Sequence, residues 1–137
     1  MTFKKTVCID FDGVIHAYTS GWQGANVVSD GPVDGAMAAI LEYQKAGFTV
    51  AVYSSRSNTN MPGGVQAMIS AIYTWMQAHV RDVYGDGHES IVNKAVNDIE
   101  YPREKPAAWV TIDDRGIQFK GIWPSPKELE DFKPWYK

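Results

Sequence analysis

Cysteine is nearly absent from this sequence, and neither acidic nor basic side chains dominate it. The single cysteine, Cys8, has no partner for an internal disulfide and sits in an apolar run, so we expect a buried thiol in a reducing compartment. Thirteen basic and 16 acidic side chains give a formal net charge of -3. This balance excludes the broad basic surface that grips nucleic acid or an anionic membrane, so we expect neither a membrane partner nor a stable nucleic-acid complex.

Long apolar runs are also missing. The first residues lead directly into Val7-Cys8-Ile9-Asp10, which predicts neither a signal peptide nor a membrane span. The chain has no internal repeat or low-complexity tract, and nothing in it indicates an obligate protein partner. We therefore expect a soluble, cytoplasmic protein with a single domain over residues 1–137, whose 45% hydrophobic content is sufficient for one core.

Short apolar runs alternate with helical patterns along the chain. Residues 6–9, 48–53 and 109–112 form continuous apolar runs, which are typical of strands covered on both faces. Residues 36–46 and 65–79 place apolar side chains at helical spacing. This alternation predicts an α/β fold of the doubly wound, Rossmann-like type, with a mainly parallel sheet and helices on both faces.

Other segments carry weaker patterns. Residues 16–34 are rich in Gly, Ser, Asn and Asp and predict a long flap loop. Apolar residues indicate a short strand near Ala95 to Ile99 and another over Ile117 to Ile122. The tail predicts a short helix around Lys127 to Phe132, followed by aromatic side chains that pack on the body of the domain.

Polar residues follow the predicted strands at the points where they end. Because the carboxyl ends of parallel strands share one edge, these side chains are expected to form one site. Carboxylates gathered there repel each other by about 4 kcal/mol per close pair at the effective dielectric of a protein surface, so a cation must relieve the repulsion. Hard oxygen ligands at a water-accessible site favour Mg²⁺. The residues concerned are Asp10 and Asp12 after the first strand, Ser54 and Ser55 after the second, and Asp113 and Asp114 after the last, with Lys105 shortly before it.

The order of these residues resembles the four motifs of the haloacid dehalogenase (HAD) superfamily. The matching segments are Asp10-Phe11-Asp12-Gly13-Val14, a hydrophobic strand ending in Ser54, Lys105-Pro106, and Ile112-Asp113-Asp114. A pair of aspartates alone is a moderate signal, but its place behind a buried strand and the residues downstream make it specific. The resemblance covers residues 6 to 114.

The resemblance implies a Mg²⁺-dependent phosphohydrolase, a phosphomonoesterase that passes through a phospho-aspartyl intermediate. By similarity, Asp10 is the nucleophile, and Asp12 is the general acid toward the leaving oxygen and then the base on water. Ser54 is expected to hydrogen-bond a phosphoryl oxygen, and Lys105 to balance charge on the phosphoryl group and the nucleophile. Asp10 and Asp114 are expected to bind the metal.

Two further metal assignments and the active-site lysine stay open. Asp113 is a second candidate for the role of Asp114, and Asp12 is expected to supply its backbone carbonyl to the metal. Lys94 competes with Lys105, which we favour because the Lys105-Pro106 pair stands at the helix-entry position associated with the family's motif.

Around the phosphate, Gly13, Ser55 and Arg56 are expected to bind substrate. For Arg56 there is an alternative: it either clamps a phosphate with its two-pronged guanidinium or pairs with a neighbouring carboxylate such as Asp114. His16 either touches substrate or is simply an exposed loop residue.

The sequence departs from the family pattern at two points. The family's frequent threonine two residues after Asp12 is Val14 here, which costs one hydroxyl group. The slots where relatives insert a cap domain hold only loop-length segments, so the protein resembles the capless branch, with the flap of residues 16–34 as cover. An open site predicts a phosphorylated small molecule, a nucleotide or a nucleic-acid end as the substrate.

Two other functions compete with this interpretation. A signalling receiver domain also joins a phosphorylated aspartate, a hydroxyl residue, a lysine and an acidic pair, but it carries the acidic pair on its first strand and the phosphorylated aspartate on a middle one. A catalytically silent HAD-like module that binds metal or phosphate is the second alternative. The presence of every catalytic residue type argues against it.

Overall fold

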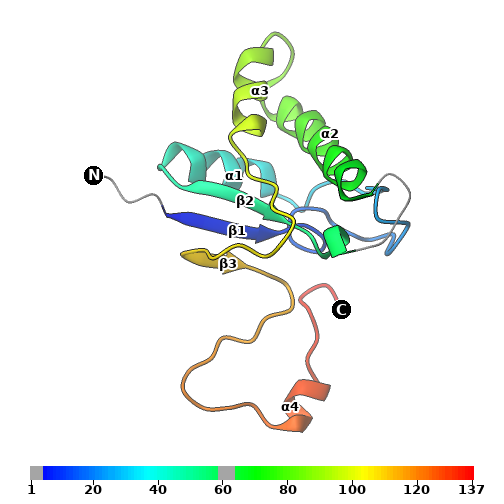
Figure 1. Cartoon of the computed structure of the whole chain (residues 1–137), viewed down its shortest axis with the longest axis vertical. Helices are drawn as coiled ribbons and strands as arrows, with labels where there is room; N and C mark the ends of the chain where they lie inside the picture. The colour runs from blue at the N-terminus through cyan, green and yellow to red at the C-terminus, as the bar shows by residue number, and fades with distance from the viewer. Residues whose placement is uncertain (1–4, 59–63) are drawn as a thin grey trace.

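The protein is described by a computed structural model that covers residues 5–58 and 64–137. Its sheet has three parallel strands, β1 (Thr6–Asp10), β2 (Thr49–Tyr53) and β3 (Val110–Ile112), in the order β2-β1-β3 (Figure 1). The three strands predicted from apolar runs are confirmed. Because β1 lies between the other two, its carboxyl end is flanked on both sides by the residues that follow β2 and β3.

The first crossover connects β1 to β2 through α1 (Ala36–Lys45). This helix buries Met37 and Ile40 toward the core, where β1 and β2 are buried along their middle residues. The chain then turns at Gly47, whose φ of 99° lies in the left-handed region that suits glycine at a helix end. The helix predicted over residues 36–46 is therefore confirmed.

The second crossover carries two helices, α2 (Gly64–Tyr84) and α3 (Glu89–Asn97), that pack on each other. Met68, Ile72 and Met76 form the buried stripe of α2, as their spacing predicts. The strand expected near residues 95–99 is wrong, because residues 95–97 belong to α3. Its two buried valines stand four residues apart, on one helical face.

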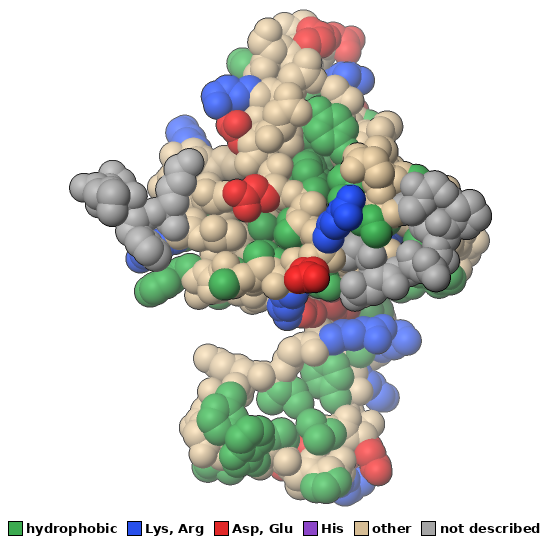
Figure 2. All heavy atoms as spheres, viewed as in Figure 1, with side chains coloured by type: hydrophobic (Ala, Val, Ile, Leu, Met, Phe, Trp, Pro, Cys, Tyr) green, Lys and Arg blue, Asp and Glu red, His purple; other side chains and the backbone are tan. Residues whose placement is uncertain are grey.

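The chain after β3 leads away from the sheet and carries only the short helix α4 (Pro126–Glu130), which the tail pattern predicted (Figure 1). Residues 117–122, all described, form no strand, so that prediction is wrong. Hydrophobic side chains gather on this segment (Figure 2). Several of them are exposed, among them Phe119, Ile122 and Trp123. The end of the tail contacts the body through Trp135 and Tyr136, as predicted for the tail aromatics.

Residues 16–34, the flap, leave the sheet and return to it before α1. The two ends of the flap are joined by hydrogen bonds from the Ala17 amide to the Gly31 carbonyl (2.9 Å) and from the Val33 amide to the Ile15 carbonyl (2.8 Å). Within the described residues, no helix has the length and apolar character needed to cross a membrane.

Candidate active site

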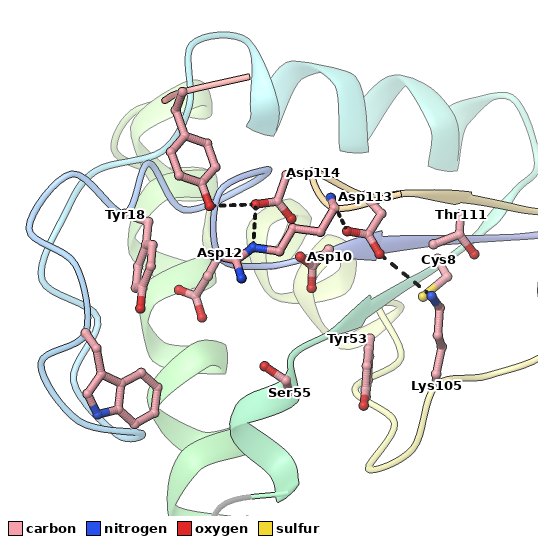
Figure 3. Close-up of a pocket in the computed structure, with 13 residues that line it drawn as sticks. Cys8, Asp10, Asp12, Tyr18, Tyr53, Ser55, Lys105, Thr111, Asp113 and Asp114 are labelled. Carbon is pink, nitrogen blue, oxygen red and sulfur yellow. Dashed lines mark hydrogen bonds and ion pairs between the residues drawn. The ribbon is translucent and has the colours of Figure 1, made fainter. Parts of the chain in front are cut away.

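A cavity of about 330 Å³ opens at the carboxyl ends of the three strands. In Figure 3 the carboxylates of Asp10, Asp12 and Asp114 lie between Tyr18 on one side and Lys105 on the other. As the strand-end rule predicts, residues that follow all three strands line this one cavity. The cavity is lined by Cys8, Asp10, Asp12, Tyr18, Trp22, Tyr53, Ser55, Lys105, Thr111, Asp113, Asp114, Arg115 and Tyr136.

Three carboxylates converge in this cavity. Oxygens of Asp10, Asp113 and Asp114 all lie within 4.8 Å of one another. Burial raises the pKa of Asp10 to about 8, and a hydrogen bond with Asp114 and the charges of the neighbouring carboxylates act in the same direction. The three oxygens are hard ligands in a water-accessible hollow, so the residues present fit a small divalent cation such as Mg²⁺. The three predicted side-chain ligands therefore lie together, and the side chain of Asp12, whose backbone carbonyl was the predicted ligand, is held by Arg56 and His16.

Lys105 is the lysine of this cavity. Its Nζ lies 3.7 Å from Asp113 Oδ2, and it lines the wall opposite the flap. Lys94, the competing candidate, lies on α3 and pairs with Asp98 at 2.7 Å, away from the cavity. The geometry therefore favours Lys105 for any role at the site.

Asp114 is packed more tightly than Asp113. Its side chain is buried, and its Oδ2 accepts a hydrogen bond from the Tyr136 hydroxyl at 2.8 Å. Gly13 lies against the same carboxylate, since a Cβ added there would stand 2.5 Å from Asp114 Oδ2. Gly13 also has a φ of 83°. It therefore serves close packing at the cavity wall, and no side chain of its own is available to bind substrate.

Arg56 and His16 bind the Asp12 carboxylate. Both of its oxygens accept from Arg56, from Nε at 2.8 Å and from Nη2 at 2.9 Å. His16 Nδ1 lies 2.8 Å from Asp12 Oδ1. Burial raises the pKa of Asp12, but the hydrogen bonds from His16 and Arg56 outweigh burial and leave the pKa below its ordinary value. Asp12 is therefore a carboxylate anion poised at the edge of the cavity.

Arg56 pairs with a carboxylate, which was one of its two sequence interpretations, but the partner is Asp12 and not Asp114. Its side chain is buried and does not line the cavity. The reason lies in the strand order. β1 separates the residues after β2 from Asp114, so the nearest carboxylate to Arg56 belongs to β1's own extension.

The two serines after β2 divide between the core and the cavity. Ser54 is buried, and its Oγ accepts from the Arg56 amide at 3.2 Å. Ser55, at the start of the short helix η1 (Ser55–Asn58), is exposed and lines the cavity. Of the pair, Ser55 is therefore the hydroxyl that faces the hollow.

Both interpretations of His16 from the sequence, a substrate contact or an exposed loop residue, are wrong: it is fully buried behind Asp12 and stacks on Phe11. Tyr136 from the tail, Arg115 directly after Asp114 and Tyr53 at the end of β2 also line the cavity, and the sequence analysis assigned them no role there. The tail aromatics were expected to pack on the domain, but the place where Tyr136 does so depends on tertiary packing.

Comparison with protein-family models, curated proteins and solved structures gives no match to this chain.

Proposed function

We propose that this protein is a Mg²⁺-dependent phosphomonoesterase of the capless HAD type, on a doubly wound α/β fold, that acts in the cytoplasm through a phospho-aspartyl intermediate on Asp10. One observation carries the proposal. Asp10 is clustered with the carboxylates of Asp113 and Asp114 in one cavity, and Lys105 lies beside Asp113. A nucleophilic carboxylate, a cation-binding set and a fixed positive charge are the components that phosphoryl transfer requires.

Asp10 attacks as a carboxylate, so its proton must be lost before the reaction. With no cation present, burial and the neighbouring charges favour the protonated form at neutral pH. Mg²⁺ held by Asp10, Asp113 and Asp114 would supply the positive charge that keeps Asp10 ionised and neutralises phosphoryl oxygens. Lys105, on the far wall, adds a second positive charge for the same oxygens.

Asp12 is the acid–base group in this proposal. For the first step it must take up a proton from solvent and pass it to the leaving oxygen. The partners that lower its pKa then keep it ionised, the form that takes a proton in the second step from the water that attacks the phospho-aspartate. Ser55 is the hydroxyl available to a phosphoryl oxygen in the cavity. Ser54 then supports the turn after β2 through its bond with the Arg56 amide.

The wall of the cavity favours a flat or extended group next to the phosphate. Tyr18 and Trp22 come from the flap, Tyr53 from β2 and Tyr136 from the tail. Aromatic side chains of this kind stack on nucleobases at about 1–3 kcal/mol per base. A nucleotide or a phosphorylated strand end is therefore the substrate class we favour over a small sugar phosphate.

The test is release of inorganic phosphate from p-nitrophenyl phosphate and from a panel of nucleoside monophosphates, with Mg²⁺ and with EDTA. Asp10→Asn should lose turnover while Asp98→Asn, the same substitution on the exposed end of α3, should keep it. Turnover in EDTA, or in Asp10→Asn, would contradict the proposal.

A non-catalytic module that binds metal or phosphate is the second candidate. It is favoured by the Tyr136 hydroxyl, which already occupies one oxygen of Asp114. Binding of Mg²⁺ by calorimetry with no phosphate release from any ester in the panel would establish this second function in place of the first.

A further inference from the structure

Arg56 lies behind the cavity and connects two separate parts of the chain. Its side chain is 1% exposed. On one side Nε and Nη2 hold the two oxygens of Asp12. On the other side Nη1 donates to three carbonyl oxygens of the flap, those of Gly24 (2.9 Å), Ala25 (3.0 Å) and Val27 (2.7 Å). One buried guanidinium therefore links the flap backbone to the Asp12 carboxylate.

A second connection starts from the same carboxylate. The Asp30 amide donates to His16 Nε2 at 3.0 Å, so the other ring nitrogen, Nδ1, carries the proton that is given to Asp12. His16 is 0% exposed and packs against Trp75, whose Nε1 donates to the Asp30 carbonyl at 2.9 Å. Asp12 is therefore tied to the flap at two places, through Arg56 and through His16.

The flap also reaches the cavity. Tyr18 and Trp22 line the hollow, and the Trp22 ring centroid lies 5.4 Å from the Arg56 guanidinium carbon. The indole that lines the cavity therefore also lies against the cation that holds Asp12.

We propose that Arg56 is a positioning residue that couples the flap to Asp12, so that a substrate group seated against Trp22 fixes the Asp12 carboxylate for proton transfer. The last step rests on the proposed function, whereas the coupling is a property of the fold. An arginine is required because only its planar fork holds both carboxylate oxygens while a third nitrogen reaches the flap. Lysine keeps the charge but cannot span both partners.

Direct binding of phosphate by Arg56 predicts a different result from positioning. All three guanidinium nitrogens already have protein acceptors, and the side chain does not line the cavity. A positioning role lowers kcat and leaves KM for a small ester nearly unchanged, since the transition state loses an aligned proton-transfer group and the ground state loses no contact. A phosphate-binding role raises KM.

The coupling is tested without any activity, by amide hydrogen exchange in EDTA. Asp12→Ala removes the carboxylate from one end of the link, and we expect exchange of the flap amides of Val27 and Asp30 to accelerate by about tenfold or more. Asp113→Ala is the matched control. It removes a carboxylate from the same cavity, and the ion pair with Lys105 and the hydrogen bond from the Arg115 amide that this carboxylate makes both lie outside the flap. Arg56→Lys, which keeps the buried charge, should accelerate the same amides. Unchanged exchange in Asp12→Ala and Arg56→Lys would overturn the coupling.

The kinetic arm compares wild type, Arg56→Lys and the exposed-site control Arg81→Lys on p-nitrophenyl phosphate. We expect Arg56→Lys to lower kcat by about 10²-fold or more, with KM within about twofold, and Arg81→Lys to match wild type. Asp12→Asn combined with Arg56→Lys should be no slower than Asp12→Asn alone, because both act through one carboxylate. A rise in KM with kcat unchanged, or additive losses in the double variant, would overturn the positioning role. An inactive wild type would refute the proposed function and leave the coupling to be decided by the exchange rates.

Discussion

The indole Nε1 of Trp135 donates a hydrogen bond to the backbone carbonyl of Gly13 at 2.8 Å. This contact brings the end of the tail to the loop that follows β1, and the next residue, Tyr136, reaches Asp114 from there. The tail is therefore part of the cavity wall, although most of the chain after β3 extends away from the sheet (Figure 1). Gly13 stands where the tail, the Asp114 carboxylate and the turn after β1 meet.

The first prediction concerns this crowded glycine. Gly13→Ala places a Cβ against Asp114 and Tyr136 and forces a left-handed backbone on a residue with a side chain, so we expect a loss of at least about 2 kcal/mol in free energy of unfolding. Gly85→Ala is the control, because Gly85 has a similar φ of 78° and nothing within 4 Å of the added Cβ. Equal losses in urea unfolding would mean that backbone strain, and not crowding at the cavity, accounts for the effect.

The second prediction concerns the cation. Mg²⁺ should raise the melting temperature of wild type by mass action, since it binds the folded cluster and not the unfolded chain. Asp113→Asn should reduce the increase, and Asp98→Asn should not. Ca²⁺ should also raise the melting temperature but support little hydrolysis, because its larger size relaxes the ligand geometry. A melting temperature that does not respond to either ion would contradict the assignment of the carboxylate cluster.

The third prediction is a pH dependence of the ion-free protein. The folded pKa of Asp10, about 8, lies above the ordinary carboxyl value, so between about pH 4 and 8 the folded state binds a proton that the unfolded state has released. Its contribution to stability is therefore full at low pH and is lost as pH rises toward 8, with a slope of at most about 1.4 kcal/mol per pH unit. In EDTA, Asp10→Asn should flatten this slope and be more stable than wild type at pH 8. A wild type that gains stability from pH 5 to 8 relative to Asp10→Asn would contradict the environment described for Asp10.

The fourth prediction concerns the substrate. Trp22→Ala should raise KM for a nucleotide substrate more than for p-nitrophenyl phosphate, because only the larger ester extends to the flap. Val83→Ala, which shortens an exposed side chain on α2, serves as the control and should change neither KM. Equal effects of Trp22→Ala on both esters would mean that the flap does not contact the part of the substrate beyond the phosphate.

The sequence predicted the three strands of the sheet and the helices α1 and α2. It also predicted that the polar residues after the strands lie at one edge of the sheet. β1 and β2 are continuous apolar runs because both faces are covered, and the stripe of α2 repeats at helical spacing because one face meets the core. Because the carboxyl ends of parallel strands share one edge, the sequence also predicted that Asp10, Ser55 and Asp113 lie close together, and all three line the cavity.

Two kinds of information were missing. Residues 92–99 hold three β-branched side chains, Val92, Val96 and Ile99, so a local pattern could not separate a strand from α3, where packing on α2 decides. The sequence does not give the spatial order of the strands. Without that order, the carboxylate suggested for Arg56 was Asp114, whereas the partner in the structure is Asp12. The contact of Trp135 with Gly13 spans the chain and likewise follows from tertiary packing alone.

The central claim is the covalent step at Asp10, and it is tested most directly by acid-quenching the Mg²⁺-loaded protein during turnover and mapping phosphorylated peptides by mass spectrometry. We expect a phosphoryl group that is labile to hydroxylamine on the peptide that carries Asp10. Asp12→Asn should accumulate it, because the base that activates water is gone, and Asp10→Asn should lack it. Phosphate release by wild type with no phosphorylated peptide in either wild type or Asp12→Asn would contradict the account.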